Sequence, residues 1–263
     1  MIGLEKRQNL VFLPYESWRP PVLSGTATAT TRVISAARRL FDLQAASIWK
    51  DLKELLPKLR GNLLDAGCGA QPYRALVPAR VQYRAIDLLS SGTNFGYRTP
   101  DTAYFQGESW PVEDGSQDVI LCTEVAEHVY DPAALFAESF RCLRPGGRLV
   151  LTVPFAARWH FIPHDYWRFT PSSLDRLLDD AGFKNRRIYA RGNALTVLCY
   201  KALSLFLPLL VANSSGRTKS ILWKTLGITF FPFTVLAALI GNLTLMTQGG
   251  NDCLGYTVLA ERP

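Results

Sequence analysis

Residues 63–76, LLDAGCGAQPYRAL, constrain the fold more than any other part of the sequence. An apolar run ends at Asp65 and is followed at once by Gly67 and Gly69. Glycines directly after a buried strand permit a tight turn and let a ligand approach the backbone closely. In open α/β sheets such turns lie at the carboxyl edge, where ligands bind. The stretch therefore predicts either a ligand-binding turn or a purely structural turn between a strand and a helix.

Short apolar runs alternate with helical patterns along most of the chain. Strands are predicted in NLLDAG, VQYRAIDL, TAYFQG, QDVILCTEV, RPGGRLVLTVPF, KNRRIYARG and LGYTVLAER. Helices are predicted between about Thr31 and Leu59 and in YRALVPA, DPAALFAESFRCL and TPSSLDRLLDDAGF. This alternation is typical of parallel sheets covered on both faces. We expect an α/β fold with a Rossmann-like, seven-stranded, mostly parallel sheet, helices on both faces and an apolar helical insertion before the last strand.

The 263 residues, 48% of them hydrophobic, suffice for one sizeable α/β domain with additions. The predicted organisation is an N-terminal arm with helices (1–60), a core (61–193), the apolar helical insertion (194–253) and a final core strand (254–263).

The charge and the cysteines narrow the class of protein. The net charge of +7 is spread along the chain rather than gathered in one tract, so no nucleic acid partner is expected. An anionic acceptor or an anionic membrane surface suits this charge equally well. The five cysteines form no CxxC pair, and the N-terminus has no long apolar stretch of the secretory type. We therefore expect a cytoplasmic protein with free thiols, with attachment to the inner face of the membrane left open.

The residues around the glycine turn indicate which ligand it would take. Asp65 can pair with a ligand ammonium, and backbone amides of the following helix can receive a carboxylate. Asp87 follows about 20 residues later at the end of the next strand, where a carboxylate can accept both hydroxyls of a ribose. A dinucleotide fingerprint requires a third glycine where Pro72 stands. The pattern therefore favours an amino-acid nucleoside over NAD.

Several segments together resemble a known family. LLDAGCGAQPY, AIDL, the stretch SWPVEDGSQDVILCTEVAEHVYDPAALFAESFRCLRPGGRLVLTVP and LDRLLDDAGF resemble the class I S-adenosylmethionine-dependent methyltransferases over roughly Asn62 to Tyr189. The resemblance is strongest to a bacterial branch with an EHVYDP-type segment and an HDYWRFTP-type segment. The latter is frequent in methyltransferases encoded with glycan assembly enzymes. The resemblance implies S-adenosyl-L-methionine as cofactor.

The same resemblance implies which residues hold the cofactor. The turn and the end of the fourth strand are implied to bind the methionine end of the cofactor. The ends of the second and third strands are implied to bind its nucleoside. These residues are Asp65, Gly67, Cys68, Gly69, Thr123 and Glu124 for the methionine end, Asp87 for the ribose, and Leu88, Gln106, Gly107 and Glu108 for the adenine. Where the family usually has an aspartate that accepts from the adenine amino group, this chain has Gln106. We therefore expect a weaker adenine contact, or one moved to Glu108.

The loop after TVPF, residues 156–171, is the candidate acceptor site. His164 beside Asp165 is predicted to act as a base, with His128 of the EH pair as a second candidate. His160, Tyr166, Trp167 and Arg168 are predicted to bind the acceptor. No metal site is expected, because two histidines and one aspartate lack a third firm ligand. The alternative is structural: His128 braces the helix near Asp131, and the loop aromatics pack over the sheet edge.

Two apolar segments, 194–212 and 226–247, precede the last strand. Each approaches the length of a membrane span. A spanning hairpin would place Arg217, Lys219 and Lys224 outside the cytoplasm, against the positive-inside tendency. An attachment in the plane of the membrane fits better, and the alternative is a helical layer packed on the sheet or on a second subunit. A homodimer is left open.

The sequence thus predicts a methyltransferase that uses S-adenosyl-L-methionine to methylate an oxygen or nitrogen of a small-molecule, glycan or lipid-linked acceptor. The alternative from another class is a catalytically inactive, methyltransferase-like binding or scaffold protein at the membrane surface. A nucleotide-sugar or NAD-dependent oxidoreductase is disfavoured by Pro72 and by the lack of a Tyr-x-x-x-Lys pair.

Overall fold

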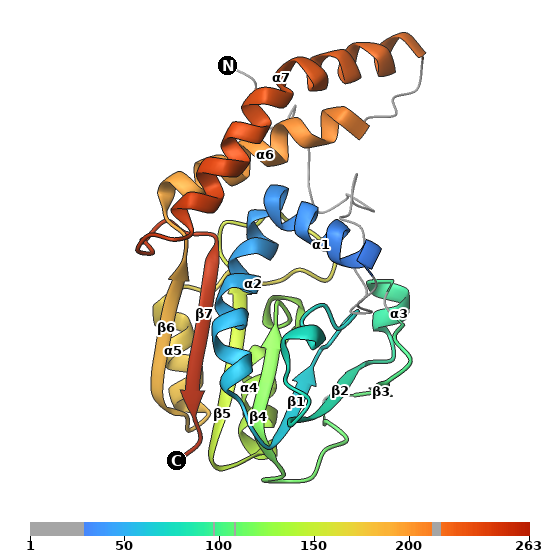
Figure 1. Ribbon diagram of the computed structural model, residues 1–263. Helices are drawn as coiled ribbons and strands as arrows, with labels where there is room; N and C mark the ends of the chain where they lie inside the picture. Colours follow the sequence, from blue (N-terminus) through green and yellow to red (C-terminus); the bar gives the residue numbers. More distant parts are fainter. Residues whose placement is uncertain (1–28, 97, 108, 212–216) are drawn as a thin grey trace, which may run out of the picture.

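A computed structural model describes residues 29–96, 98–107, 109–211 and 217–263 (Figure 1). The helices are α1 (Ala29–Phe41), α2 (Leu43–Leu55), α3 (Ser91–Asn94), α4 (Pro132–Cys142), α5 (Pro171–Asp180), α6 (Ala194–Val211) and α7 (Arg217–Thr244), with 3₁₀ turns η3 (Leu56–Lys58), η4 (Arg74–Leu76) and η5 (Ala126–His128). The strands are β1 (Asn62–Ala66), β2 (Gln82–Leu88), β3 (Thr102–Phe105), β4 (Gln117–Thr123), β5 (Leu143–Pro154), β6 (Lys184–Arg191) and β7 (Gly255–Glu261). The predicted arm over residues 1–27 and Glu108 lie outside the described residues.

The strands form one seven-stranded sheet in the order β3-β2-β1-β4-β5-β7-β6. Pairing is parallel from β3 to β5, while β7 runs antiparallel to both β5 and β6. The order reverses between β1 and β4, which is the kind of switch point where open α/β sheets bind ligands. The expected mostly parallel sheet with an apolar helical insertion before the last strand is therefore confirmed.

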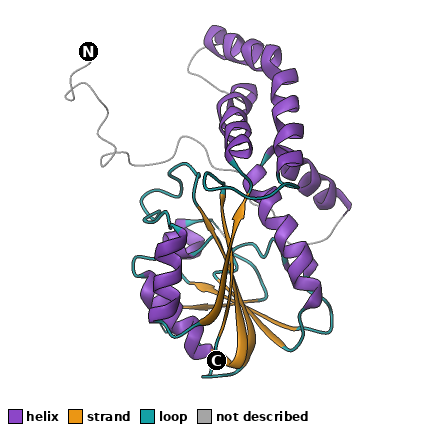
Figure 2. Cartoon of the chain, turned by 90° about the vertical axis from the view of Figure 1, so that its left-hand side faces the viewer, coloured by secondary structure: helices purple, strands orange, loops and turns teal. Residues whose placement is uncertain are grey.

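Side chains that alternate along the central strands bury both faces of the sheet. Leu63 and Leu121 pack against α2, while Leu64 and Ile120 pack in the cluster that contains α4 and α5. Successive strand residues point to opposite faces, so a continuous apolar run is buried on both sides. Figure 2 shows helices on both sides of the sheet and the last two helices beyond one end of it.

Local sequence signals fix the helix ends. The Asp131 carboxylate accepts from the amides of Ala133 and Ala134 at the start of α4, and Thr170 forms a capping box with Ser173 at the start of α5. A side-chain cap of this kind stabilises a helix by about 1 kcal/mol. Asp131 therefore caps α4 itself, and His128 is not needed to brace it.

The apolar insertion forms two helices that pack on each other and extend away from the sheet (Figure 1). Their end near the sheet is anchored, because Leu43, Cys199, Leu203, Ala238 and Leu245 form a buried cluster. Within the described residues, the stretch Ile221–Thr244 is long and apolar enough to cross a membrane, and only 22% of its most apolar window is buried.

Candidate active site at the carboxyl edge of the sheet

The glycine turn after β1 is built by backbone contacts with β2. The amides of Gly67 and Cys68 both donate to the carbonyl oxygen of Ile86, at 3.0 and 3.2 Å. Gly67 has φ +68°, and a Cβ atom there would lie 2.6 Å from Cγ2 of Val125. Only glycine fits this close approach without displacing Val125. The turn therefore packs against the segment that follows β4.

The helix expected directly after this turn is not observed. Between Gly69 and β2 the chain forms turns and the single 3₁₀ turn η4. Pro72 and Pro78 flank η4 and leave no room for an uninterrupted helix, because proline lacks the N–H that a helix interior requires. The predicted helix after the turn is therefore wrong, and the amides of Gly67, Cys68 and Gly69 have partners within the fold.

Asp87 stands at the end of β2 as predicted, and its carboxylate is held rigidly. Oδ2 accepts from the Gly69 amide at 2.9 Å, and Oδ1 accepts from the Leu88 amide at 2.7 Å. Burial nevertheless raises the pKa of Asp87, although these hydrogen bonds oppose the shift. Each carboxylate oxygen retains a second lone pair. The residue is thus oriented to accept further hydrogen bonds from a ligand such as a ribose.

A pocket of about 420 Å³ lies next to Asp87, at the ends of β2 and β3. It is lined by Leu88, Leu89, Ser90, Thr93, Arg98, Phe105, Gln106 and Gly107. Three of the residues predicted at the adenine, namely Leu88, Gln106 and Gly107, therefore share one cavity. Its volume is in the range of small-molecule sites, and the space around the Gly107 Cα is open. These residues fit the nucleoside part of S-adenosylmethionine.

Asp65 and Cys68 are buried and do not line this pocket. The Asp65 side chain is 2% exposed and accepts from the Tyr83 hydroxyl at 2.6 Å. Burial raises the pKa of Asp65 to about 7, although the Tyr83 hydrogen bond opposes the shift. The Cys68 thiol is buried 3.4 Å from the Thr102 hydroxyl. Their predicted contacts with the methionine end remain predictions.

A buried arginine, which the sequence analysis did not identify, fixes the end of β4. Arg191 of β6 is 2% exposed and donates to Glu124 Oε1 at 2.8 Å. It also donates to the Val153 carbonyl at 2.9 Å and to the Ser47 hydroxyl at 3.1 Å. Glu124 has φ +53°, and the neighbouring Thr123 is paired with β5. Both residues predicted at the methionine end are therefore held in place.

The turn η5 and the loop after β5 are joined into one unit. The Glu127 carbonyl accepts from the amides of Tyr166 and Trp167, at 2.8 and 3.2 Å. The Trp167 indole N–H donates to the Val129 carbonyl at 2.9 Å, and His128 Nδ1 lies 2.6 Å from the His164 carbonyl oxygen. These bonds hold the predicted acceptor loop directly over the end of β4.

The carboxylate of Asp165 is not paired with the neighbouring His164, and the predicted role of His164 as a base stays a prediction. Asp165 instead binds Arg168 through two hydrogen bonds of 2.6 and 2.7 Å and lies 2.9 Å from His160 Nδ1. Burial would raise the pKa of Asp165, but Arg168 and His160 outweigh it and hold the pKa well below its ordinary value. The Arg168 guanidinium is therefore committed to Asp165, while the His164 ring lies beside Phe95 and the Tyr166 hydroxyl.

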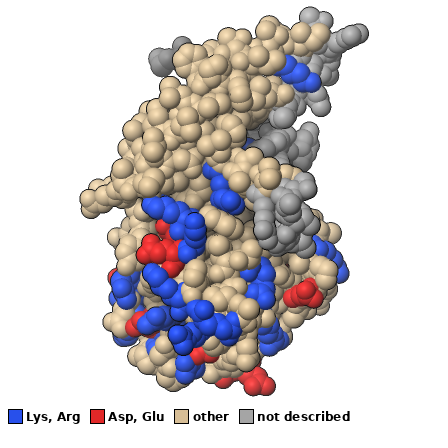
Figure 3. Space-filling view, in the orientation of Figure 1, with Lys and Arg blue, Asp and Glu red and all other residues tan. Residues whose placement is uncertain are grey.

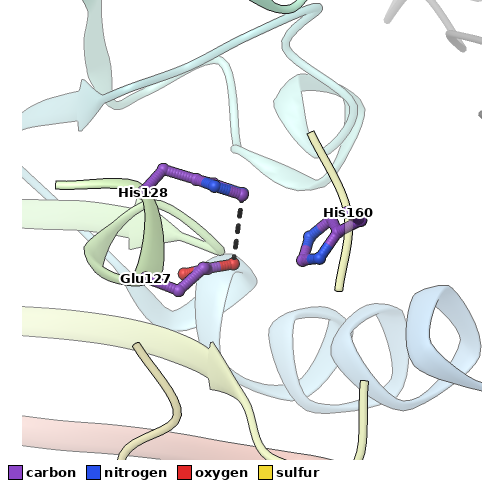
Figure 4. Close-up of side chains that lie close together, drawn as sticks. All are labelled: Glu127, His128 and His160. Carbon is purple, nitrogen blue, oxygen red and sulfur yellow. Dashed lines mark ion pairs between the residues drawn. The ribbon is translucent and has the colours of Figure 1, made fainter. Parts of the chain in front are cut away.

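Glu127, His128 and His160 point toward one another at this edge (Figure 4). His128 Nε2 lies 3.6 Å from Glu127 Oε1, and the two imidazole centroids are 4.9 Å apart. Burial raises the pKa of Glu127 well above its ordinary value, and burial together with His160 lowers the pKa of His128 to about 4. His128 is therefore a neutral imidazole near pH 7. The sequence analysis noted the EH pair but did not assign Glu127 a role.

These features define an α/β protein with a small-molecule pocket next to Asp87 and a cluster of titratable side chains, Glu127, His128 and His160, both at the carboxyl edge of its sheet. Comparison with known proteins gives the family. The family described as "Methyltransferase domain" matches residues 38–188, which is more than half of the chain. The chain belongs to this family, and S-adenosylmethionine is its cofactor. When bound, this cofactor supplies an electrophilic methyl group.

Several known proteins are similar to this chain. A ubiquinone biosynthesis O-methyltransferase of Psychrobacter arcticus is 28% identical over 160 residues, covering 48% of this chain and 60% of the relative. A protein of Mycolicibacterium smegmatis named as an S-adenosylmethionine-dependent methyltransferase is 32% identical over 136 residues, covering 47% of this chain and 52% of the relative. The alignments thus span little more than half the length of these curated relatives. An S-adenosylmethionine-dependent methyltransferase structure of Thermotoga maritima matches with a TM-score of 0.53 at 16% identity, over 88% of this chain and 95% of the other.

Proposed function

We propose that this protein transfers a methyl group from S-adenosylmethionine to a hydroxyl oxygen of a lipid-linked acceptor at a membrane surface. One observation carries the proposal. The nucleoside pocket beside Asp87 and the cluster of Glu127, His128 and His160 lie at the same edge of the sheet. Parallel strands bring their carboxyl ends to one edge, so a cofactor and an acceptor bound there would meet.

The reaction requires the acceptor to lose a proton. The acceptor oxygen forms a bond to the methyl carbon while the carbon–sulfur bond breaks, and sulfur keeps the electron pair. The hydroxyl proton must leave before or during this step, so titratable groups beside the oxygen assist. The cluster of Glu127, His128 and His160 is proposed to receive the hydroxyl, and the rigid turns around it would hold the reacting atoms in line.

The surface of the helical pair supports a lipid-linked acceptor. Leu222, Ile228 and Phe233 of α7 are 65%, 67% and 63% exposed. In Figure 3 the upper part of the molecule is almost free of charged side chains, whereas lysines and arginines gather on the lower body. Apolar surface of this extent is characteristic of partner or membrane contacts. Lys201 of α6 donates to the Ala156 carbonyl at 2.9 Å, which connects this surface to the acceptor loop.

The similar proteins add support for oxygen as the acceptor atom. The name of the Psychrobacter arcticus relative specifies an O-methyltransferase of ubiquinone biosynthesis. At 28% identity over 160 residues, this similarity suggests a reaction type and leaves the acceptor itself to experiment.

Calorimetric titration with S-adenosylhomocysteine tests the cofactor part of the proposal. We expect binding of S-adenosylhomocysteine but not of NAD or a nucleotide sugar, each titrated into the same purified protein in mild detergent. Binding without methyl transfer to any lipid-linked acceptor would favour the inactive scaffold alternative, and no binding by the folded protein would refute the proposal.

Flotation with vesicles of phosphatidylethanolamine and phosphatidylglycerol tests the membrane part. We expect the intact chain to float and the double variant Ile228→Glu/Phe233→Glu to remain at the bottom, because two charges would enter the lipid interface. Tyr189→Glu is the matched control, since Tyr189 lies on β6 and is 47% exposed. Equal flotation of both variants would contradict membrane attachment through α7.

A further inference from the structure

The three side chains of the edge cluster carry an inference beyond the removal of a proton. One ligand-type atom from each of Glu127, His128 and His160 lies within 4.8 Å of the others. Two of these residues belong to η5 and the third belongs to the loop after β5, and Figure 4 shows all three directed into a common space. Two imidazoles and one carboxylate are a ligand set that proteins use for divalent transition metals.

The Glu127 carboxylate gives an independent reason to expect a cation. The residue is 0% exposed, and within the part of the chain that the structure describes neither Oε1 nor Oε2 has a hydrogen-bond partner. A buried carboxylate without partners is costly, and buried charges in proteins are normally paired or coordinated to metal. His128 Nε2 lies 3.6 Å from Oε1, which is too far for a hydrogen bond.

Both histidines are held in the tautomer that a metal requires. His128 Nδ1 is 2.6 Å from the His164 carbonyl oxygen, which can only accept a hydrogen bond, so Nδ1 carries the hydrogen. His160 Nδ1 lies 2.9 Å from the Asp165 carboxylate and 3.1 Å from the Arg158 carbonyl, so it also donates. Each neutral ring is thereby left with an unprotonated Nε2. A carbonyl or carboxylate behind each ligating histidine is the usual outer support of metal sites.

We propose that Glu127, His128 and His160 bind one divalent transition-metal ion, with Zn²⁺ as the best match to the ligand set. Ligands about 2.0–2.2 Å from zinc lie roughly 3.3 Å apart in a tetrahedron. The three ligand atoms lie within 4.8 Å of one another, so the longest separation must shorten by up to about 1.5 Å. His160 is carried by a loop and can supply this movement. Mg²⁺ is a poor match, because it prefers oxygen ligands and retains several waters.

The role of the ion rests on the proposed function, whereas its binding does not. Three protein ligands leave a fourth position open, which is the arrangement of catalytic rather than structural zinc sites. An acceptor hydroxyl in that position would lose its proton more easily, because a bound metal stabilises the resulting oxyanion. The proton would pass to water, and the acceptor oxygen would form its bond to the methyl carbon as the carbon–sulfur bond breaks.

The sequence analysis expected no metal site, because it considered only His160, His164 and Asp165, which are close along the chain. This set lacks a third firm ligand. The structure replaces two of the three members, since Asp165 supports His160 from behind and His164 contributes only its carbonyl. Glu127 and His128, more than thirty residues upstream, complete the set instead.

Metal binding to the chelator-stripped protein is the decisive test, with Zn²⁺ followed by calorimetry and Co²⁺ by visible absorption. We expect one equivalent of each, with intense tetrahedral Co²⁺ bands and no thiolate charge-transfer band. His160→Gln and Glu127→Gln should each weaken Zn²⁺ binding by more than the 10–100-fold that loss of an outer support typically costs. His160→Gln is the safer variant for folding, because His160 lies in a loop and is only partly buried.

His164→Gln is the matched control, because the chain has only three histidines and this one should not be a ligand. Its Zn²⁺ affinity should stay within about threefold of the parent protein. The inference is refuted if the folded protein binds no Zn²⁺, if His164→Gln loses as much affinity as His160→Gln, or if a thiolate band appears. Titration with S-adenosylhomocysteine on the same stripped samples separates the two proposals. Cofactor binding without Zn²⁺ binding would reject only the metal, and the reverse would reject only the methyltransferase function.

Discussion

The buried carboxyl of Asp65 makes the stability of this fold depend on pH. Asp65 is 2% exposed, and burial raises its pKa from 3.8 to about 7, against the opposing hydrogen bond from Tyr83. In the unfolded chain the group ionises near its ordinary pKa, whereas in the folded protein it stays protonated up to about pH 7. Its contribution to stability is therefore fully present below about pH 4 and is lost as the pH rises through about 7.

The size of this effect follows from the shift. A change of about three pKa units corresponds to roughly 4 kcal/mol at 1.36 kcal/mol per unit. Typical domains are stable by only about 5–15 kcal/mol, so the loss would be readily detected. Asp65→Asn removes the titration and keeps the shape of the side chain.

Chemical denaturation between pH 4 and 8 measures the effect, with the parent protein and Asp65→Asn compared at each pH. Other groups titrate equally in both proteins, so the difference in unfolding free energy isolates Asp65. We expect this difference to shift in favour of Asp65→Asn by up to about 4 kcal/mol as the pH rises. A difference that stays constant with pH, or that shifts toward the parent protein, would refute the assignment of a protonated, buried Asp65.

Three further outcomes follow from the geometry of the site. Asp87→Asn should weaken S-adenosylhomocysteine binding by about 10–100-fold in calorimetry, because hydrogen bonds to a charged group contribute about 1.5–3 kcal/mol; unchanged affinity would move the ribose away from Asp87. Arg191→Met should lower the free energy of unfolding by about 3–5 kcal/mol, because it leaves Glu124 without its buried partner, and a loss below 1 kcal/mol in denaturant titration would argue against a buried ion pair. Gly67→Ala should cost about 1–3 kcal/mol from its positive φ alone, and adding Val125→Ala should recover only the part of the loss that is due to the clash.

Much of the fold could be predicted from local patterns. The apolar run QDVILCTEV becomes β4, Gln117–Thr123, because a strand buried on both faces needs apolar residues without alternation. Thr170 was expected to begin a helix and does so through a capping box. The segment YRALVPA fails as a helix because Pro72 and Pro78 leave space for one 3₁₀ turn only. Here the backbone limits of proline outweigh the helical preference of the residues between.

Site residues could be predicted from the sequence only where they directly follow the end of a strand. Asp87 and Gln106 follow β2 and β3 directly, so their place at the edge follows from the parallel order of the strands. Arg191 reaches Glu124 across 67 residues of sequence, and no spacing rule connects them. The partner of Asp165 depends on how the loop reverses: His160 supplies both its amide and its ring to the same carboxylate, at 2.9 Å each.

The two short motifs EHVYD and HDYWRF are joined by one set of hydrogen bonds that involve the backbone. Glu127 offers its carbonyl to the amides of Tyr166 and Trp167, while the His164 carbonyl lies against the His128 ring. Each motif thus satisfies polar groups that the other would otherwise bury without partners, which would cost about 1–3 kcal/mol for each group. Because these bonds use the backbone carbonyls of Glu127 and His164, a change in the path of the loop backbone would alter the chemistry of Glu127 and His128, whereas a change of the His164 side chain alone would not. The two joined segments therefore form one functional unit at this edge of the sheet. The roles of His128 and His164 depend on both segments.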